Sequence, residues 1–151
     1  MHVDRTHEYE NVPINLIGAD YVKTSNSDKT SNPLLVEVTV DVVADLYLFL
    51  DNRISSDVAT AMPWVGVLGF TDTGADLDID EAGDGDVDQS FSIYLKSNVA
   101  AGSTTFLEQD NGGSRNFYGI AAVAAVPEPA TAALGLLGIG GLLMRRKRHA
   151  A

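Results

Sequence analysis

The sequence predicts an all-β domain of β-sandwich or jelly-roll-like architecture, followed by a C-terminal hydrophobic helix. Apolar and polar residues alternate over residues 34–42 and again over 89–96, the period-two pattern of half-buried strands. Turn-forming residues separate these apolar runs, as in sandwiches and barrels, and the sequence before residue 126 has no sustained helical period. We therefore divide the chain into a body, residues 1–125, and a tail, residues 126–151.

The expected strands follow one another along the body. In the first of them Val36, Val38, Val40 and Val42 are expected to face one way. Residues 44–50 are apolar on both faces after their start, which predicts a strand covered on both sides. The other expected strands are 89–96, 104–107 and 117–123, with shorter candidates at 14–17, 20–23 and 64–70, and with turns at 25–28, 72–74, 101–103 and 110–113.

Length, cysteine content and charge restrict the functions that the chain can have. A chain of 151 residues has room for one modest domain and the tail. It has no cysteine, which excludes disulfides, thiolate metal sites and a cysteine nucleophile. Residues 1–126 carry six Lys or Arg and twenty Asp or Glu, a net charge of −14, and the tail adds +3. Because so acidic a body repels phosphates, we expect no nucleic-acid partner.

Residues that could carry catalysis are few. His2, His7 and His149 lie near the termini, outside the predicted core. Without a central histidine or a cysteine, a Ser-His-Asp or Cys-His arrangement cannot be assembled. Carboxylates are abundant, but no pair stands out as a glycosidase pair. We therefore expect a protein that is not an enzyme.

The acidic stretch 76–88 is the best metal candidate in the sequence. Calcium prefers carboxylate and carbonyl oxygens on a flexible loop, and here it would be bound by Asp80, Asp84, Asp86 and Asp88. The EF-hand template fails, because counting from Asp80 puts Ala82 in the third position and Phe91 in the twelfth. We favour a solvated acidic connection between two strands, with calcium as the alternative and no other cofactor.

Two further side chains have a functional and a structural interpretation. Trp64, the only tryptophan, could stack on a sugar ring from an exposed loop. Because it lies between Pro63 and the apolar run 65–68, we expect it in the core. Arg53 could bind an anion, but after Asp51 we expect it to pair with a neighbouring carboxylate.

The tail combines three segments in a fixed order. These are Val126-Pro127-Glu128-Pro129, the uncharged residues 130–144, and the basic cluster Arg145-Arg146-Lys147-Arg148. The prolines prevent a helix from continuing into the tail from upstream. Fifteen helical residues rise about 22 Å, whereas a bilayer core needs about 30 Å, so residues 130–144 suit brief membrane retention. Basic residues behind an apolar tract favour the cytoplasmic side, which leaves the body outside.

This tail resembles the PEP-CTERM sorting signal of exported proteins from Gram-negative-type bacteria that produce exopolysaccharide. The resemblance implies that exosortase, a membrane enzyme, reads Pro127-Glu128-Pro129 and processes the tail. The protein would be anchored transiently in the inner membrane through residues 130–144 and would then reach the cell surface or the extracellular matrix. A permanently anchored structural protein is an alternative. Residues 1–10 lack the basic and apolar regions of a secretory signal, which suggests a miscalled start, a truncated gene or a mature fragment. Early strands could then be missing, so that the body would be truncated at its N-terminus.

The body is similar, more loosely, to small β-sandwich modules of extracellular bacterial proteins. The similarity extends over 44–53, Trp64, 69–74, 91–94, 101–102 and 117–120. Such modules also occur beside carbohydrate-active enzymes. The similarity implies an ancillary, carbohydrate-binding role as a further alternative, with extracellular polysaccharide as the partner.

Overall fold

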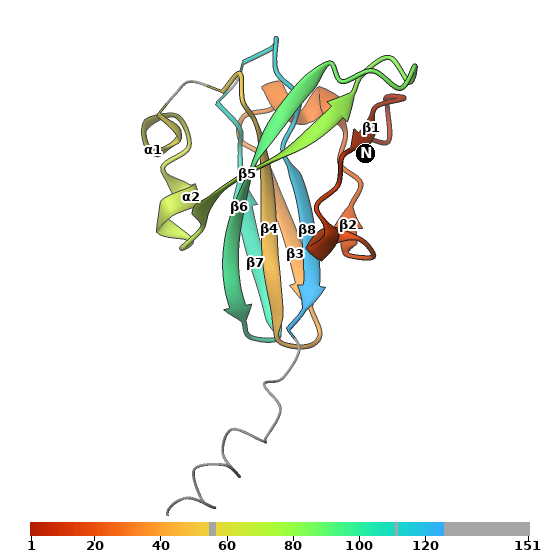
Figure 1. The fold of residues 1–151 in the computed structure, drawn as a ribbon. Helices are drawn as coiled ribbons and strands as arrows, with labels where there is room; N and C mark the ends of the chain where they lie inside the picture. Colours follow the sequence, from red (N-terminus) through yellow and green to blue (C-terminus); the bar gives the residue numbers. More distant parts are fainter. Residues whose placement is uncertain (55–56, 111, 126–151) are drawn as a thin grey trace, which may run out of the picture.

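The described residues form two antiparallel sheets (Figure 1). The computed structural model describes residues 1–54, 57–110 and 112–125. The larger sheet has the strand order β1-β5-β6-β4-β8-β2, and the smaller sheet pairs β3 with β7. Their bounds are β1 Glu8–Glu10, β2 Asp20–Val22, β3 Leu35–Val40, β4 Ala44–Asp51, β5 Thr71–Asp80, β6 Gln89–Val99, β7 Gly102–Leu107 and β8 Gly119–Ala124. The prediction of a mainly β body is confirmed, and the predicted helix 130–144 lies outside the described residues.

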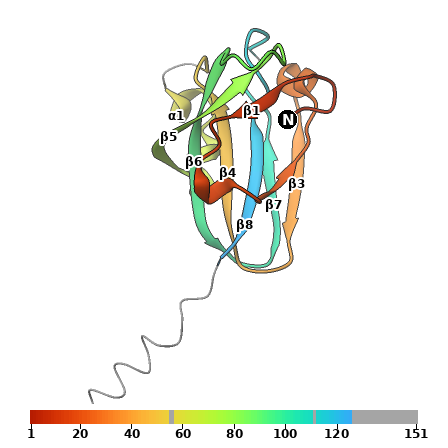
Figure 2. The same ribbon diagram turned by 45° about the vertical axis from the view of Figure 1, so that its right-hand side comes forward.

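Strand β4 lies between two hydrophobic cores, as its doubly apolar sequence predicts. Leu46, Leu48 and Leu50 are buried in the core shared by the two sheets. Tyr47 and Phe49 point the other way, into a second core. Figure 2 shows the N-terminal segment running across the larger sheet, and residues of this segment contribute to the second core.

Strand β3 shows the predicted alternation, with one exception. Val36 and Val38 are half-buried and Val40 is buried, whereas Glu37 is exposed. Val42 was expected to face inward with them, but it is 58% exposed. The reason is that β3 ends at Val40, so Val42 lies in the turn before β4, outside the alternation of the strand.

Two of the shorter strand predictions are wrong because local turns compete with extended structure. Residues 64–70 contain helix α2, Trp64–Val67, which follows helix α1, Val58–Ala61. Pro63 has φ −59° and ψ −23°, so it starts a helical turn, and Gly69 at φ 86° terminates it. Residues 14–17 likewise contain a 3₁₀ helix, Ile14–Leu16. The third short candidate, 20–23, is confirmed as β2.

Strand β5 was not predicted, because its acidic residues suggested a connection. Leu77 and Ile79 alternate with aspartates and are buried, so residues 76–80 belong to the larger sheet and only residues 81–88 connect β5 to β6. The expected turn at 72–74 is instead an irregularity within β5, where the pairing with β6 shifts and Gly74 has φ 73°. Within the described residues, none of the helices has the length and hydrophobicity needed to cross a membrane.

Candidate functional site

A buried carboxylate lies at the end of the domain where β4 terminates. The side chain of Asp51, the last residue of β4, is fully buried. Arg53 Nη2 donates to Asp51 Oδ2 at 2.6 Å and to Glu81 Oε1 at 3.0 Å. The hydrogen bond from Arg53 to Asp51 is the main reason why the pKa of Arg53 is raised. The expectation that Arg53 pairs with neighbouring carboxylates is confirmed.

Two asparagines extend this cluster to other segments. The backbone N–H of Asn116 donates to Asp51 Oδ2 at 2.7 Å, and Asn116 Nδ2 donates to Glu81 Oε1 at 2.7 Å. Asn26 Nδ2 in turn donates to Asn116 Oδ1 at 3.1 Å. We call Asp51, Arg53, Glu81, Asn116 and Asn26 the loop-end network. Its polar groups join segments that are distant in sequence, which is a structural use of buried polar side chains.

His2 is buried, so the expectation that it lies outside the interior is wrong. Its Nδ1 is 3.3 Å from Thr24 Oγ1, and its Nε2 is buried without a hydrogen-bond partner among the described residues. The rings of His2 and His7 pack edge to face, with centroids 5.8 Å apart. Burial, and then the neighbouring His7, lower the pKa of His2 to about 4.

The predicted calcium ligands are used to close the connection between β5 and β6. Asp80 Oδ1 accepts from Gly83 N–H at 2.5 Å, and Asp80 Oδ2 accepts from Gly85 N–H at 2.7 Å. The hydrogen bond from Gly85 contributes most to lowering the pKa of Asp80. Asp88 also accepts hydrogen bonds from the backbone N–H groups of Glu81 and Ala82. Asp84 accepts one from the backbone N–H of Asp86. In the part of the chain that the structure describes, no group of three or more His, Asp or Glu could hold a metal ion.

Trp64 lies in the core, as expected, and is 8% exposed. Its ring packs edge to face against Phe106 and Tyr118, with centroid distances of 6.1 and 5.7 Å. The indole N–H donates to the backbone oxygen of Glu108 at 3.0 Å. Trp64 therefore does not form the exposed platform that stacking on a sugar requires.

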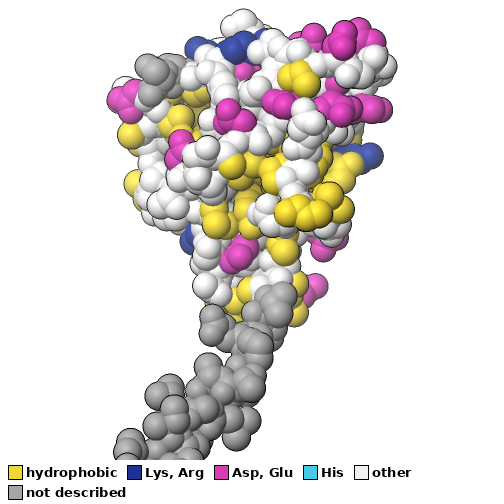
Figure 3. Space-filling model, viewed as in Figure 1, with side chains coloured by type: hydrophobic (Ala, Val, Ile, Leu, Met, Phe, Trp, Pro, Cys, Tyr) yellow, Lys and Arg dark blue, Asp and Glu magenta, His cyan; other side chains and the backbone are white. Residues whose placement is uncertain are grey.

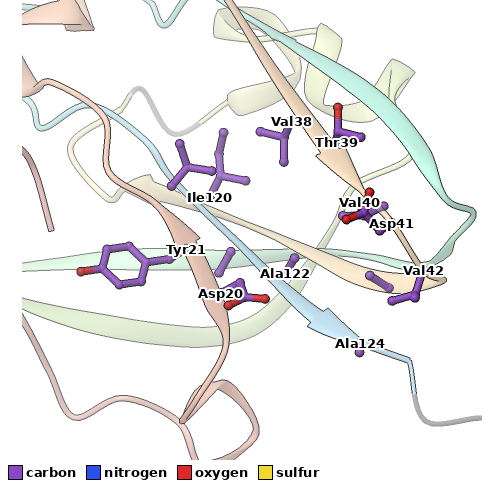
Figure 4. A pocket seen from close by; sticks show the side chains of 13 residues that line it. Asp20, Tyr21, Val38, Thr39, Val40, Asp41, Val42, Ile120, Ala122 and Ala124 are labelled. Carbon is purple, nitrogen blue, oxygen red and sulfur yellow. The ribbon is translucent and has the colours of Figure 1, made fainter.

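An open groove of about 400 Å³ lies between the two sheets (Figure 4). One side is formed by residues 38–42, from β3 and the turn after it, and the other by β2. Ile120, Ala122 and Ala124 of β8 lie between them. Figure 3 shows hydrophobic side chains gathered on the face where β8 and β2 lie. Sequence reasoning identified the strands but not the groove, because the pattern of one strand does not show which edges remain unpaired.

The last described residue shows where the chain leaves the domain. Ala125 follows β8, and its N–H donates to the oxygen of Val43 at 2.9 Å, beside the turn between β3 and β4 (Figure 1). From this point, residues 125–148 match the family model of the PEP-CTERM protein-sorting motif. The end of the chain carries a PEP-CTERM sorting motif. This match includes both predicted parts of the signal, Val126–Pro129 and Arg145–Arg148, which lie outside the described residues.

The PEP-CTERM motif implies an export-targeted protein with a C-terminal sorting signal that exosortase processes. The match covers the tail and says nothing of the body. No curated protein and no solved structure matches the chain.

Proposed function

We propose that this is a non-enzymatic protein whose body is released at the cell surface or in the extracellular matrix after exosortase has processed its tail. The observation that carries the proposal is the match of residues 125–148 to the PEP-CTERM motif. In this proposal, Pro127, Glu128 and Pro129 are recognised and residues 130–144 hold the protein briefly in the inner membrane. The basic cluster 145–148 keeps the C-terminus in the cytoplasm.

The geometry of the body supports this order of events. The matched segment begins at Ala125, the residue that is hydrogen-bonded to the turn between β3 and β4. An enzyme that reads Pro127-Glu128-Pro129 would therefore work within a few residues of a folded domain. The non-enzymatic role is supported by the loop-end network, whose carboxylates Asp51 and Glu81 are occupied by Arg53 and Asn116.

The proposal is tested by replacing Pro127, Glu128 and Pro129 together with alanine in the full chain. The host is a bacterium that has exosortase. Immunoblots of inner-membrane, surface and medium fractions should show a shortened wild-type protein outside the inner membrane and a full-length variant retained in it. Thr131→Ala, in the tail but outside Pro127-Glu128-Pro129, is the matched control and should be processed normally.

Two outcomes would contradict the proposal. Normal processing of the triple variant would show that the motif is not read. A full-length wild-type protein in the inner-membrane fraction would instead support the permanently anchored alternative.

A further inference from the structure

We propose that the groove between β3 and β2 accepts an extended peptide strand, with basic residues at its ends, from a partner protein. This inference concerns the body and does not depend on how the tail is processed. The occupant would add to an open sheet edge, the mode of recognition in which main-chain hydrogen bonds supply affinity and alternate side chains supply specificity.

Among the described residues, strand edges at the groove are unpaired. In the described part of the chain β3 pairs only with β7, so its other edge has free N–H and C=O groups between Leu35 and Val40. This edge of six residues corresponds to about 20 Å of strand. On the opposite side, β2 covers only residues 120–122 of β8, whereas β4 pairs with all of 119–124. Among the described residues, the far end of β8 therefore also lacks a neighbour on that side.

Backbone atoms line the groove together with side chains. Successive side chains of a strand point to opposite faces, so a pocket that meets one face is lined by every second residue. Here the lining includes every residue of β3 from Val38 to its end at Val40, and every residue of β2, 20–22. Because β3 is paired on one side only among the described residues, its free edge borders the groove, where an added strand could form hydrogen bonds.

The surface between the two strand edges is mainly aliphatic. The half-buried Val22 and Val38 and the exposed Val42 supply aliphatic surface, and Ala122 leaves room above β8. Such a surface suits the alternate apolar side chains of a strand. A sugar would instead need an aromatic face and fixed polar groups. Tyr21 is the only aromatic residue in the lining, and it belongs to one side of the groove.

The charge of the groove also restricts which peptide it would accept. The charged residues that line the groove are Asp20 and Asp41, both acidic. Residues 1–126 as a whole have a net charge of −14, which disfavours a second copy of the body as the occupant. A strand with lysine or arginine at its ends would pair with the two aspartates and be attracted by the body.

Fluorescence anisotropy with the full chain in mild detergent tests the proposal. The probe is a labelled synthetic peptide, Lys-Val-Thr-Val-Thr-Val-Lys. Two control peptides replace both lysines with glutamate, or methylate alternate backbone nitrogens. We expect the probe to bind saturably and both controls to bind at least tenfold more weakly. Binding that is equal for the methylated peptide, or no binding at all, would overturn the proposal.

Variants of the protein locate the binding. Ala124→Phe fills the groove, and Ala100→Phe adds the same ring in the exposed turn between β6 and β7. Ala124→Phe should weaken binding at least tenfold and Ala100→Phe should not. The double variant D20N/D41N should weaken binding and reduce its salt dependence. Hydrogen exchange of the wild-type protein provides a test without substitution, since the peptide should slow exchange along β3.

Two other occupants would be recognised in the same experiments. If a polysaccharide such as dextran displaces the peptide, the groove is a carbohydrate site. If sedimentation shows a dimer that Ala124→Phe dissociates, the groove is a self-association surface. Either result would overturn the proposal.

Discussion

The loop-end network and the groove differ in whether their polar groups are hydrogen-bonded within the domain. At the loop end, Asp51 is fully buried and accepts hydrogen bonds from Arg53 and from the backbone of Asn116. At the groove, one edge of β3 has no strand beside it in the described part of the chain. The two regions are connected, since β8 begins three residues after Asn116 and lines the groove at Ile120.

This difference separates what stabilises the fold from what remains available for binding. Buried polar groups that are paired fix the relative positions of loops, and removing one partner leaves the other without compensation. Unpaired strand edges contribute nothing to the isolated fold, but they can pair with an added strand. We therefore expect substitutions at the loop end to change stability and substitutions at the groove to change binding.

The largest effect is expected from Asp51→Ala. It would leave the buried N–H of Asn116 without its acceptor and the Arg53 guanidinium with Glu81 as its remaining carboxylate, because Asp51 Oδ2 accepts from both. We expect the free energy of unfolding in a urea titration to fall by about 3 kcal/mol. Glu81→Ala is the control, and because its side chain is 31% exposed we expect a loss of about 1 kcal/mol. Equal losses in the two variants would show that burial of Asp51 is not decisive.

The lowered pKa of His2 predicts that the folded protein loses stability in mild acid. Its pKa is about 4 in the folded protein against 6.5 for an ordinary histidine, so between these values the unfolded chain binds a proton that the folded chain does not. Stability therefore falls as the pH drops from about 6.5 to 4, by at most about 3 kcal/mol. His7, the N-terminal amino group and Asp4 are the charged groups near His2 that modulate this change.

Urea titrations at several pH values should show this slope in the wild-type protein and a smaller slope in His2→Gln. The variant keeps a polar side chain that can contact Thr24 but cannot be protonated in this range. An unchanged slope in His2→Gln would assign the pH dependence to other groups.

Much of the fold could be predicted from local patterns. The alternation in β3 and the doubly apolar character of β4 correspond to the environments that the two strands occupy. The wrong predictions concern segments where local residue types opposed or hid the hydrophobic pattern. Pro63 makes a helix of the apolar run that begins at Trp64, and the aspartates of β5 hide an alternation in which Leu77 and Ile79 are buried.

The candidate sites could be predicted only where they are contiguous in sequence. The sorting motif is one segment, and the match at 125–148 agrees with the prediction made from Val126–Pro129 and the basic cluster. The pairing of Arg53 with Asp51 is also local. In contrast, Glu81 and Asn116 reach Arg53 and Asp51 only through the fold, and no sequence pattern identifies them in advance.

Gly119→Ala tests the junction between the two regions. A Cβ atom at this position would lie 2.5 Å from Tyr9 Oη and 2.9 Å from Phe49 Cδ2. Relieving these contacts should lower the free energy of unfolding by about 1–3 kcal/mol. Gly113→Ala is the control, because a Cβ there would meet no atom within 4 Å. If both variants were equally stable, Tyr9 and Phe49 would have to move at little cost.

The smallest change in stability is expected from Ala124→Phe, the substitution that should affect the groove most. Ala124 is exposed and lines the groove, so a phenylalanine there meets open space rather than a packed core. We expect the free energy of unfolding to change by no more than about 0.5 kcal/mol, while binding of the basic peptide weakens at least tenfold. A loss of stability comparable to that of Asp51→Ala would contradict the comparison. It would mean that the space between β3 and β8 is closed in solution and that the groove side is as fully packed as the loop end.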